Sequence, residues 1–255
     1  MAELTLESLS IGRGDKALYR DISLAASASQ FWGILGENGA GKTTLLHTIA
    51  RLLGRQSGRI LLNGVEVRKL PRKMLARKMG VLLQAADSGF PFTIYESVMA
   101  GRYAYISPWG KPSEYDESLV SQALTAVGLA HRQTERADIL SGGEQRRVAI
   151  ATVLAQSPDV YLLDEPANHL DLKFQVKILQ HFSSLVKEHK RLAMMTVHDI
   201  NLAARFCTHL VMLFPEGRWL AGPTAKLLNS DNLSQLYSHP VHSLVDGGRT
   251  LWYPG

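Results

Sequence analysis

Short apolar runs alternate with amphipathic stretches along most of this chain. Alternating apolar and polar positions predict strands at 4–9 and 18–24, and the unbroken apolar run at 30–35 is typical of a buried strand. Apolar positions three or four residues apart predict helices at 45–53, 114–127, 141–154 and 171–190. Compact apolar runs predict further strands at 79–83, 159–163, 192–197 and 210–214. Strands that alternate with helices in this way indicate a largely parallel sheet covered by helices.

Turn residues divide the remaining segments. Asn63-Gly64 predicts a hairpin within 59–67, and Pro71 suits the first turn of a short helix that runs to about Lys78. Residues 85–110 are rich in Gly, Pro, Ser and aromatic residues, which is typical of a loop. In the tail we expect one helix over about 225–237 and a final strand pair around Leu244 and Trp252.

The predicted fold class is therefore α/β, with a mostly parallel core sheet and a separate antiparallel β layer in the N-terminal third. We expect one domain over residues 1–255. Residues 1–85 and 157–255 would form the core with its tail, and residues 86–156 a helical insertion. The chain contains no internal repeat or low-complexity segment.

Composition narrows the class of protein. The 255 residues are 45% hydrophobic and 20% charged, as in ordinary globular proteins. The formal net charge of +5 is too weak to indicate a nucleic-acid partner. Cys207 is the only cysteine, which excludes an intramolecular disulfide and suits a reducing compartment. We find neither a signal peptide at the N-terminus nor a run that approaches the ~18 apolar residues of a membrane span.

A phosphate-loop motif joins the strand at 30–35 to the helix that begins near 45. It reads Gly36-Glu37-Asn38-Gly39-Ala40-Gly41-Lys42-Thr43-Thr44 and fits G-x-x-x-x-G-K-[ST] at every required position. Glycines let backbone N–H groups turn inward toward phosphate oxygens, and the helix start adds partial positive charge. Lys42 can reach the β- and γ-phosphates, and the Thr43 hydroxyl can ligate Mg²⁺. The motif predicts a site for a nucleoside triphosphate.

Two polar clusters fit the same chemistry. Asp164-Glu165 follows an apolar strand, so Asp164 could hold Mg²⁺ through water while Glu165 orients or deprotonates the attacking water. Alone, this pair could equally be a solvated acidic turn. Ser141-x-x-Glu144 is a capping box for the next helix, and a glycine-bearing helix start is also a site for anions. Both interpretations of that segment can hold together.

Six motifs now resemble those of the ATP-binding-cassette (ABC) ATPases. Besides the phosphate loop, Leu140–Gln145 is similar to their signature loop, Val160–Glu165 to their Walker B strand and Asn168–Asp171 to their D-loop. Gln84 matches the Q-loop and His198 the switch histidine. A lone Gln or His is usually structural, but the six motifs occur in the order and spacing of the family.

The resemblance implies a head-to-tail homodimer in which ATP lies between the phosphate loop of one subunit and the signature loop of its partner. Ser141, Gly142, Gly143 and Glu144 would then face the partner's nucleotide. His198 would contact the γ-phosphate within its own subunit. The implied catalytic residues are Glu165, His198, Lys42 and Gln84, and the implied Mg²⁺ ligands are Thr43, Gln84 and Asp164.

Two positions depart from the family pattern. The family usually has Gln where Glu144 stands, so this chain carries an additional negative charge near ATP. The aromatic residue that stacks on adenine aligns with Arg13, whose planar guanidinium can also stack on a base. Tyr19 is in the following predicted strand and out of phase with that position.

A narrower resemblance concerns the cargo class. The segment Phe90–Val98, followed by Gly101-Arg102-Tyr103, looks like the ATPases of bacterial importers for iron–siderophore complexes, haem and cobalamin. Such subunits dock under integral-membrane permeases at the cytoplasmic face of the inner membrane, and a separate binding protein selects the cargo. Phe90, Phe92, Ile94 and Tyr95 would line the docking groove, or would simply pack the helical insertion.

Alternative functions are an ATPase of another ABC importer or exporter, or a soluble ABC protein such as a cluster-assembly factor. One phosphate loop in 255 residues does not fit the long coiled coils of repair relatives or the paired cassettes of translation relatives. A purely structural nucleotide-binding module fits poorly with Glu165 and His198 both present. No residue here encodes the cargo, because cargo contacts belong to other chains.

Overall fold

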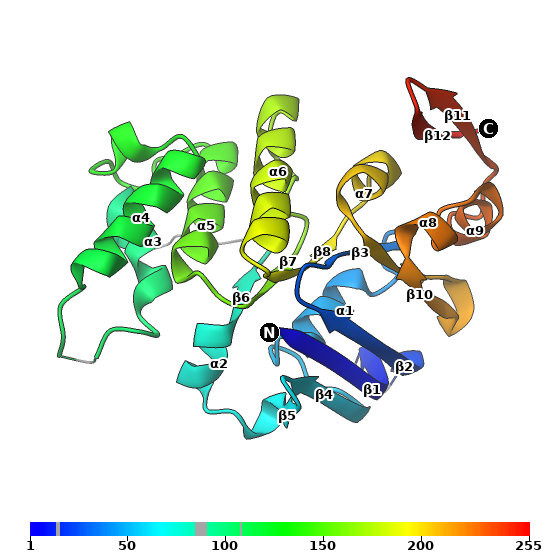
Figure 1. The fold of residues 1–255 in the computed structure, drawn as a ribbon, viewed down its shortest axis with the longest axis horizontal. Helices are drawn as coiled ribbons and strands as arrows, with labels where there is room; N and C mark the ends of the chain where they lie inside the picture. Colours follow the sequence, from blue (N-terminus) through cyan, green and yellow to red (C-terminus); the bar gives the residue numbers. More distant parts are fainter. Residues whose placement is uncertain (14–15, 85–90, 108) are drawn as a thin grey trace. The chain divides into compact units, whose positions relative to one another are not determined.

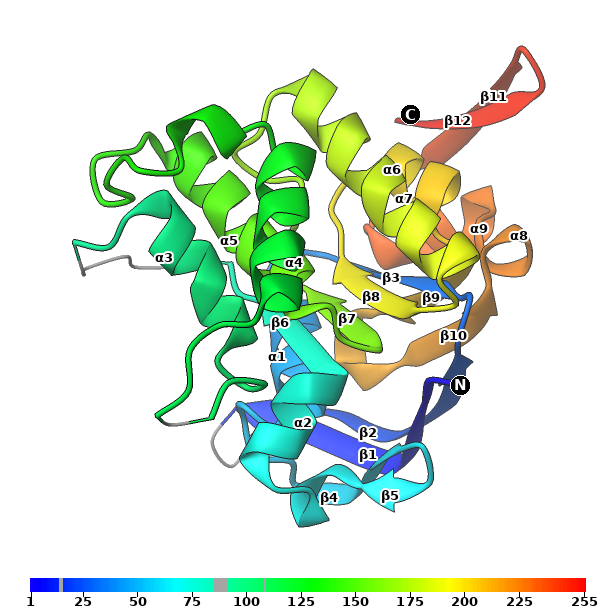
Figure 2. The same ribbon diagram turned by 60° about the vertical axis from the view of Figure 1, so that its left-hand side comes forward.

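The computed structural model describes residues 1–13, 16–84, 91–107 and 109–255 (Figures 1 and 2). Its contacts divide the chain into two compact units. The first comprises Met1–Lys69 with Leu185–Gly255, and the second comprises Leu70–Ser184. The boundaries expected from the sequence, at residues 86 and 156, stay a prediction.

An antiparallel β layer forms one part of the first unit. Its strands are β1 (Glu3–Arg13), β2 (Lys16–Ser27), β4 (Ser57–Leu62) and β5 (Val65–Glu66), in the order β2-β1-β4-β5. Leu4 is opposite both Ala26 and Leu62, and all three are buried, as the alternating pattern predicted. Asn63 and Gly64 both have positive φ, 52° and 75°, which is the geometry of a tight hairpin turn. A short 3₁₀ turn, η1 (Val67–Lys69), follows.

Parallel strands form the other β layer of the first unit. The strand β3 (Phe31–Gly36) pairs in parallel with both β8 (Leu192–Thr196) and β9 (His209–Leu213). An antiparallel strand, β10 (Trp219–Pro223), extends this layer beside β9. Every residue of β3 and β8 is buried, which explains why these strands appear in the sequence as unbroken apolar runs. The predicted combination of parallel core strands and an N-terminal antiparallel layer is confirmed.

The remaining elements of the first unit lie mainly in its C-terminal part (Figure 1). They are α1 (Lys42–Ile49), α7 (Ile200–Phe206), η4 (Pro215–Gly217), α8 (Thr224–Leu227), α9 (Ser230–Leu236), β11 (Val241–Asp246) and β12 (Arg249–Pro254).

Two predictions about helices in this unit were wrong. The first helix ends at Ile49, and Leu52 and Leu53 beyond it are about half exposed. The tail contains two helices, because Leu228 leaves the helical conformation and Asn229 caps a new helix with its side chain.

The second unit begins with a helix and two parallel strands. The elements are α2 (Arg72–Lys78), β6 (Met79–Leu82) and β7 (Val160–Leu163). A long helix, α6 (Leu172–Glu188), begins in this unit, and the Tyr161 ring packs edge-on against Phe182 at 5.5 Å between centroids. We expected Leu172, at the start of the helix predicted over 171–190, to face inward. It is instead 74% exposed, because the buried stripe of α6 begins six residues later, at Ile178.

Helices make up the rest of the second unit. They are α3 (Ile94–Met99), η2 (Ala100–Arg102), α4 (Glu114–Ala126), η3 (Ala130–Arg132) and α5 (Gly142–Gln156). The helix α3 lies inside the segment that composition predicted to be a loop. Thr93 and Glu96 form a reciprocal capping box there, and Ile94, Val98 and Met99 are buried. This start signal, S/T-x-x-E, was present in the sequence and outweighs the loop-like composition around it.

Packing accounts for Gly101 and Arg102. A Cβ at Gly101 would lie 2.2 Å from the carbonyl oxygen of Thr152, so a side chain there would collide with α5. Arg102, which is 3% exposed, donates to Asp116 at 2.8 Å and stacks on the Tyr105 ring at 3.8 Å. The segment therefore joins η2, α4 and α5 within this unit.

None of the helices in the described ranges is both long and apolar enough to cross a membrane.

Candidate nucleotide site

The phosphate loop connects β3 to α1 in the first unit. Gly36 ends the buried strand, and a Cβ there would lie 2.8 Å from the carbonyl oxygen of Leu213 on β9. Gly41, the residue before α1, has a φ of 93°, in the left-handed region that favours glycine. Glycines at these two positions let the chain leave the strand close to its neighbour and turn directly into the helix.

The Lys42 ammonium group lies beneath this loop. Its Nζ donates to the carbonyl oxygens of Gly36 at 2.8 Å and Glu37 at 2.9 Å, and the residue is 6% exposed. No side chain of the described residues caps α1, and its first turn contains no acidic residue. The first N–H groups of a helix have no partner within the helix, so the loop and α1 together present donors and a positive charge to an anion.

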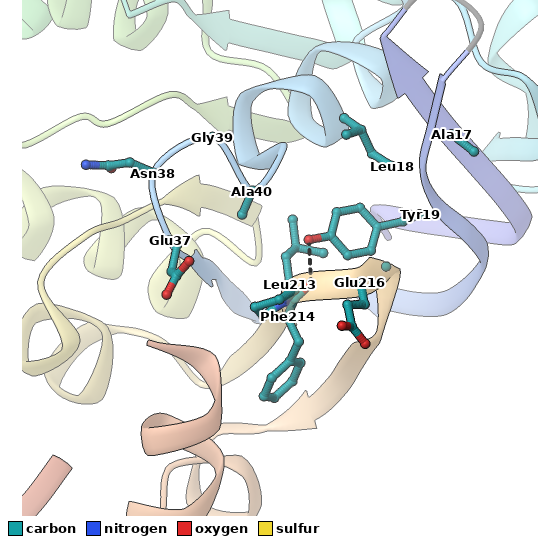
Figure 3. Close-up of a pocket in the computed structure, with 12 residues that line it drawn as sticks. Ala17, Leu18, Tyr19, Glu37, Asn38, Gly39, Ala40, Leu213, Phe214 and Glu216 are labelled. Carbon is teal, nitrogen blue, oxygen red and sulfur yellow. Dashed lines mark hydrogen bonds between the residues drawn. The ribbon is translucent and has the colours of Figure 1, made fainter. Parts of the chain in front are cut away.

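A cavity of ≈ 480 Å³ lies beside the phosphate loop (Figure 3). It is lined by Ala17, Leu18, Tyr19, Glu37, Asn38, Gly39, Ala40, Leu213, Phe214, Pro215, Glu216 and Gly217. The Tyr19 hydroxyl donates to the carbonyl oxygen of Phe214 at 2.9 Å, and burial raises the pKa of Tyr19 to about 12. Tyr19 is thus a neutral, buried part of the cavity wall. The side chain of Arg13 lies outside the described part of the chain.

His198 follows the strand next to β3. Thr196 at the end of β8 is opposite Ile34 of β3, so His198 and Gly36 each lie two residues beyond a paired position. In a parallel pair the strands end at the same edge, which places His198 at the same edge as the start of the phosphate loop. His198 is exposed, and the Asp199 carboxylate caps α7 by accepting from the Asn201 and Leu202 N–H groups.

The acidic pair lies at the end of β7 in the second unit. Asp164 is fully buried, and Glu165 is 9% exposed with a φ of 47°. The amide nitrogen of Gln84, just beyond β6, donates to Glu165 Oε2 at 3.0 Å, and the Asn168 amide donates to the same oxygen. This unit therefore brings Gln84 and the Glu165 carboxylate together. A left-handed φ at a non-glycine residue marks local strain, which is common at functional sites.

Arg146 of α5 connects the signature helix to both strand ends. Its guanidinium donates to the carbonyl oxygens of Leu83, Gln84, Asp164 and Glu165. Burial lowers the pKa of Arg146, while the Asp164 and Glu165 carboxylates oppose that shift. Sequence reasoning did not single out this residue, because its partners are backbone atoms and leave no pattern in the sequence.

The signature loop begins α5 with a complete capping box. Ser141 Oγ donates to Glu144 Oε2 at 2.8 Å, and the Ser141 N–H donates to the same oxygen at 3.0 Å. Arg132 pairs with the other carboxylate oxygen, and these contacts lower the pKa of Glu144 to about 2. An added Cβ would lie 2.9 Å from the His169 carbonyl oxygen at Gly143, whereas at Gly142 it would meet no heavy atom within 4 Å.

Another residue that the sequence did not indicate is Tyr237, at the end of α9. Burial, followed by the nearby Asp199 and Glu37 carboxylates, raises its pKa to about 12. Its hydroxyl is buried without a hydrogen-bond partner among the described residues. Within those residues there is also no group of three or more His, Cys, Asp or Glu side chains that could hold a metal.

A glycine-rich loop leads from a buried parallel strand into a helix and contains a buried lysine. These features define the chain as a phosphate-loop nucleoside triphosphatase. Residues 19–168 match the family model described as ABC transporter. The chain belongs to that family, as an ATP-binding subunit that hydrolyses ATP to power transport.

Named relatives cover nearly the whole chain. The iron(3+)-hydroxamate import ATP-binding protein of Bacillus subtilis (strain 168) is 33% identical over 246 residues, which is 96% of this chain and 91% of the relative. The hemin import ATP-binding protein of Bordetella pertussis is 35% identical over 243 residues, 92% and 91% of the two chains. A solved structure of a metal-chelate type ABC transporter in an inward-facing conformation matches with a TM-score of 0.84 at 24% identity. It covers 100% of this chain and 98% of that one.

Proposed function

We propose that this chain is the ATPase subunit of a membrane importer for metal chelates of the iron–siderophore, haem or cobalamin type. The observation that carries the proposal is the end-to-end similarity to import ATP-binding proteins for an iron(3+)-hydroxamate and for hemin. These relatives carry different cargoes at similar identity, so the similarity supports the chelate class and no single member of it. Integral-membrane permease subunits are the partners that this function requires, and the cytoplasmic face of the inner membrane is its location.

ATP binds with its phosphates in the loop from Gly36 to Thr44. The loop N–H groups and the start of α1 hold the phosphate oxygens, and Lys42 exchanges its two carbonyl partners for the β- and γ-phosphates. Thr43, Gln84 and Asp164 would hold Mg²⁺, and the ion would supply positive charge to neutralise the phosphates. The donor set fits such an ion because it consists of a hydroxyl, an amide and a carboxylate, all hard oxygen ligands.

Glu165 takes the proton from the water that attacks the γ-phosphate, and His198 fixes the position of that phosphate. The Gln84 and Asn168 amides hold the Glu165 carboxylate in one orientation before the reaction. Positioning and charge stabilisation account for most of the rate enhancement in such sites.

A head-to-tail homodimer completes each site with the signature loop of the partner. Ser141 and Gly142 are exposed at the start of α5, where the first N–H groups of a helix have no partner within the helix, and a Cβ at Gly142 would meet no heavy atom within 4 Å. The packing of this chain does not require glycine at that position, which supports a role toward a partner's nucleotide.

Substitution of Glu165 tests the catalytic assignment. E165Q keeps the shape of the side chain but cannot accept a proton, so we expect ATP binding to be retained and turnover to fall at least about a hundredfold. The variant should also accumulate as a closed dimer with MgATP, measured by light scattering. K42A is the control that should lose ATP binding itself. Hydrolysis by E165Q at the wild-type rate would exclude Glu165 as the base.

Adenine stacks on the Arg13 guanidinium in this proposal. Loss of a stacked guanidinium costs about 1 kcal/mol, so R13A in the E165Q background should bind ATP about fivefold more weakly. Y19F is the matched control, because Tyr19 is buried in the wall of the cavity beside the loop and should not affect the affinity. Equal ATP affinity of R13A and its parent in equilibrium titrations would refute the assignment.

The importer assignment is tested by a pull-down of the tagged chain from solubilised membranes of its host, with and without ATP. Recovery of a polytopic permease is the expected result, and the identity of that permease narrows the cargo. Recovery of soluble partners alone under mild detergent conditions would overturn the importer assignment and leave a soluble ABC protein as the better explanation.

Among the aromatic and apolar residues expected to line a docking groove for the permease, Phe92 is 49% exposed and available for that contact. Ile94 is buried within the second unit, and Phe90 lies outside the described residues.

A further inference from the structure

The hairpin of β11 and β12 at the end of the first unit has two chemically different faces. Its register pairs Val241 with Pro254 and Asp246 with Arg249, so every second pair lies on the same face. One face, called here the outer face, consists of His242 with Tyr253, Leu244 with Leu251, and Asp246 with Arg249. The other face consists of Val241 with Pro254, Ser243 with Trp252, and Val245 with Thr250.

Contacts within its own unit hold this hairpin at the buried Val241 and along the free edge of β12. Val241 is buried and Trp252 is half-buried. Asn201 of α7 donates through Nδ2 to the Trp252 carbonyl oxygen at 3.0 Å and accepts from the Trp252 N–H at 2.8 Å. Two hydrogen bonds to one amide side chain thus fix the middle of β12 to the helix that follows His198 and Asp199.

The outer face is open. Leu244 is 57% exposed, Leu251 42% and Tyr253 47%, and together they form an apolar band between the polar ends of the hairpin. A two-stranded hairpin with an apolar face in water is only marginally stable by itself. Contiguous exposed apolar side chains bordered by charged ones are typical of a surface that contacts another protein.

Chemical order along the outer face makes it complementary to a second copy of itself. Consider a two-fold axis that lies in the plane of the contact and is perpendicular to the strands. It would stack the outer faces of two hairpins, β11 on β11 and β12 on β12, with the hairpin tips pointing in opposite directions. The leucines then meet their own counterparts in the centre. The Asp246 carboxylate meets the partner's His242 imidazole, and the Arg249 guanidinium lies over the partner's Tyr253 ring. All the contacts occur in pairs, as an isologous interface requires.

We propose that the outer face of this hairpin is a contact between two copies of the chain that forms without nucleotide. Figure 2 shows the hairpin extending away from α8 and α9, so the antiparallel arrangement leaves these helices of the two copies at opposite ends of the contact. The contact goes beyond the proposed nucleotide-dependent dimer and uses none of its residues. Because Asn201 anchors the hairpin to α7, the contact joins the copies through the segment that begins at the switch histidine.

Cysteine cross-linking tests this contact in the full chain. Cys207 is the only native cysteine and is buried, and burial raises the pKa of its thiol, so the wild type should not cross-link. L244C places a thiol at the centre of the proposed contact, opposite its own counterpart. V245C is the matched control, because Val245 is the next residue, is 69% exposed and points from the other face.

Without ATP, we expect L244C to form covalent dimers with a short bismaleimide about a hundredfold faster than V245C, because thiols held in one interface react at about mM effective concentration whereas separate subunits at about 10 µM meet only by diffusion. Equal rates for the two variants, whether high or low, would overturn the proposal. ATP titrations of both variants distinguish this failure from a failure of the nucleotide site.

Charge reversal at the hairpin tip gives an independent measurement. D246K in the L244C background removes the carboxylate that faces the partner's His242, so the cross-linking rate should fall about tenfold, equivalent to about 1.4 kcal/mol. E188K changes the net charge equally at an exposed position near the end of α6 and should leave the rate unchanged. An equal effect of both substitutions would mean that net charge, not the outer face, controls the encounter, and would contradict the proposal.

Discussion

Glu144 carries a negative charge at the start of α5, and its neighbours neutralise that charge locally. Ser141 donates twice to one carboxylate oxygen, Arg132 pairs with the other, and Arg147 lies 3.8 Å away. The glutamate that replaces the usual glutamine of the resembling family is therefore compensated within its own unit. A glutamine at this position would keep the capping geometry and remove only the charge.

We consequently expect the difference in stability between the wild type and E144Q to depend on pH. Since the Ser141 and Arg132 contacts lower the pKa of Glu144 to about 2, the charge stabilises the folded state fully above the ordinary glutamate pKa of 4.5 and loses that effect as the pH falls toward 2. The wild type should be more stable than E144Q by a constant amount above about pH 5, and the advantage should shrink below about pH 4.5. Urea unfolding of both proteins across this pH range measures the difference in the free energy of unfolding. An advantage that stays constant down to pH 3 would contradict the prediction.

At the scale of elements, one buried guanidinium joins α5 to the ends of β6 and β7. Arg146 donates to carbonyl oxygens on both sides of Gln84 and Glu165, so the backbone of the acidic pair and of the Q-loop residue has a common support. A buried acceptor left without a donor costs about 1–3 kcal/mol. The position of the Glu165 carboxylate therefore depends on a residue of the signature helix.

R146A should lower the free energy of unfolding by about 3 kcal/mol or more and reduce ATP turnover of the assembled transporter. R146K should not restore either, because one ammonium group cannot reproduce the planar, forked set of donors. R147A is the matched control, since Arg147 mainly stacks on Phe174 at 4.4 Å and should cost about 1 kcal/mol or less. Denaturant unfolding and phosphate release are the measurements, and similar losses in R146A and R147A would argue against this role.

Elements with a strong local pattern were predictable from the sequence, and those set by competing signals were not. The phosphate loop, α4, α5 and the hairpin at Asn63 follow from motif, period or turn chemistry, and the structure confirms them. By contrast, α3 lies among loop-forming residues, and only the Thr93–Glu96 capping box indicated it. Leu52 and Leu53 continue the apolar period of α1, yet the helix ends at Ile49 because Ala50 caps it and Arg51 takes a left-handed φ of 61°.

The candidate site was predictable to the extent that its residues carry motifs. Gln84 and Glu165 meet within the second unit, and the Gly36 loop and His198 lie at one strand edge within the first. Arg146 was not predicted from the sequence, because its contacts are to backbone atoms, which leave no fixed spacing along the chain. Tyr237 was not predicted either, because burial of a single side chain leaves no such spacing. The roles of all these residues in the reaction stay a prediction.

At the scale of the whole molecule, bound nucleotide should raise the free energy of unfolding. A ligand that binds only the folded state adds about 2.7 kcal/mol at a concentration a hundred times its Kd. For a chain of this size, MgATP should therefore raise the Tm of E165Q by roughly 5–10 °C. K42A should show almost no shift at the same ATP concentration, because its loop has lost the charge that the phosphates require. A shift of equal size in K42A would mean that ATP stabilises the fold from another site.

The left-handed backbone at Glu165 has a consequence for selection. A glutamate in that conformation is strained by about 1 kcal/mol, whereas glycine adopts it freely. Replacement of Glu165 by glycine would relieve that strain, but it would also remove the acceptor of the Gln84 and Asn168 amides and the proposed catalytic carboxylate. Two hydrogen bonds at about 0.5–1.5 kcal/mol each offset the strain that glycine relieves, so a laboratory library screened only for heat resistance would select weakly between the two residues. Only a screen that also demands hydrolysis would select firmly for the proposed catalytic carboxylate.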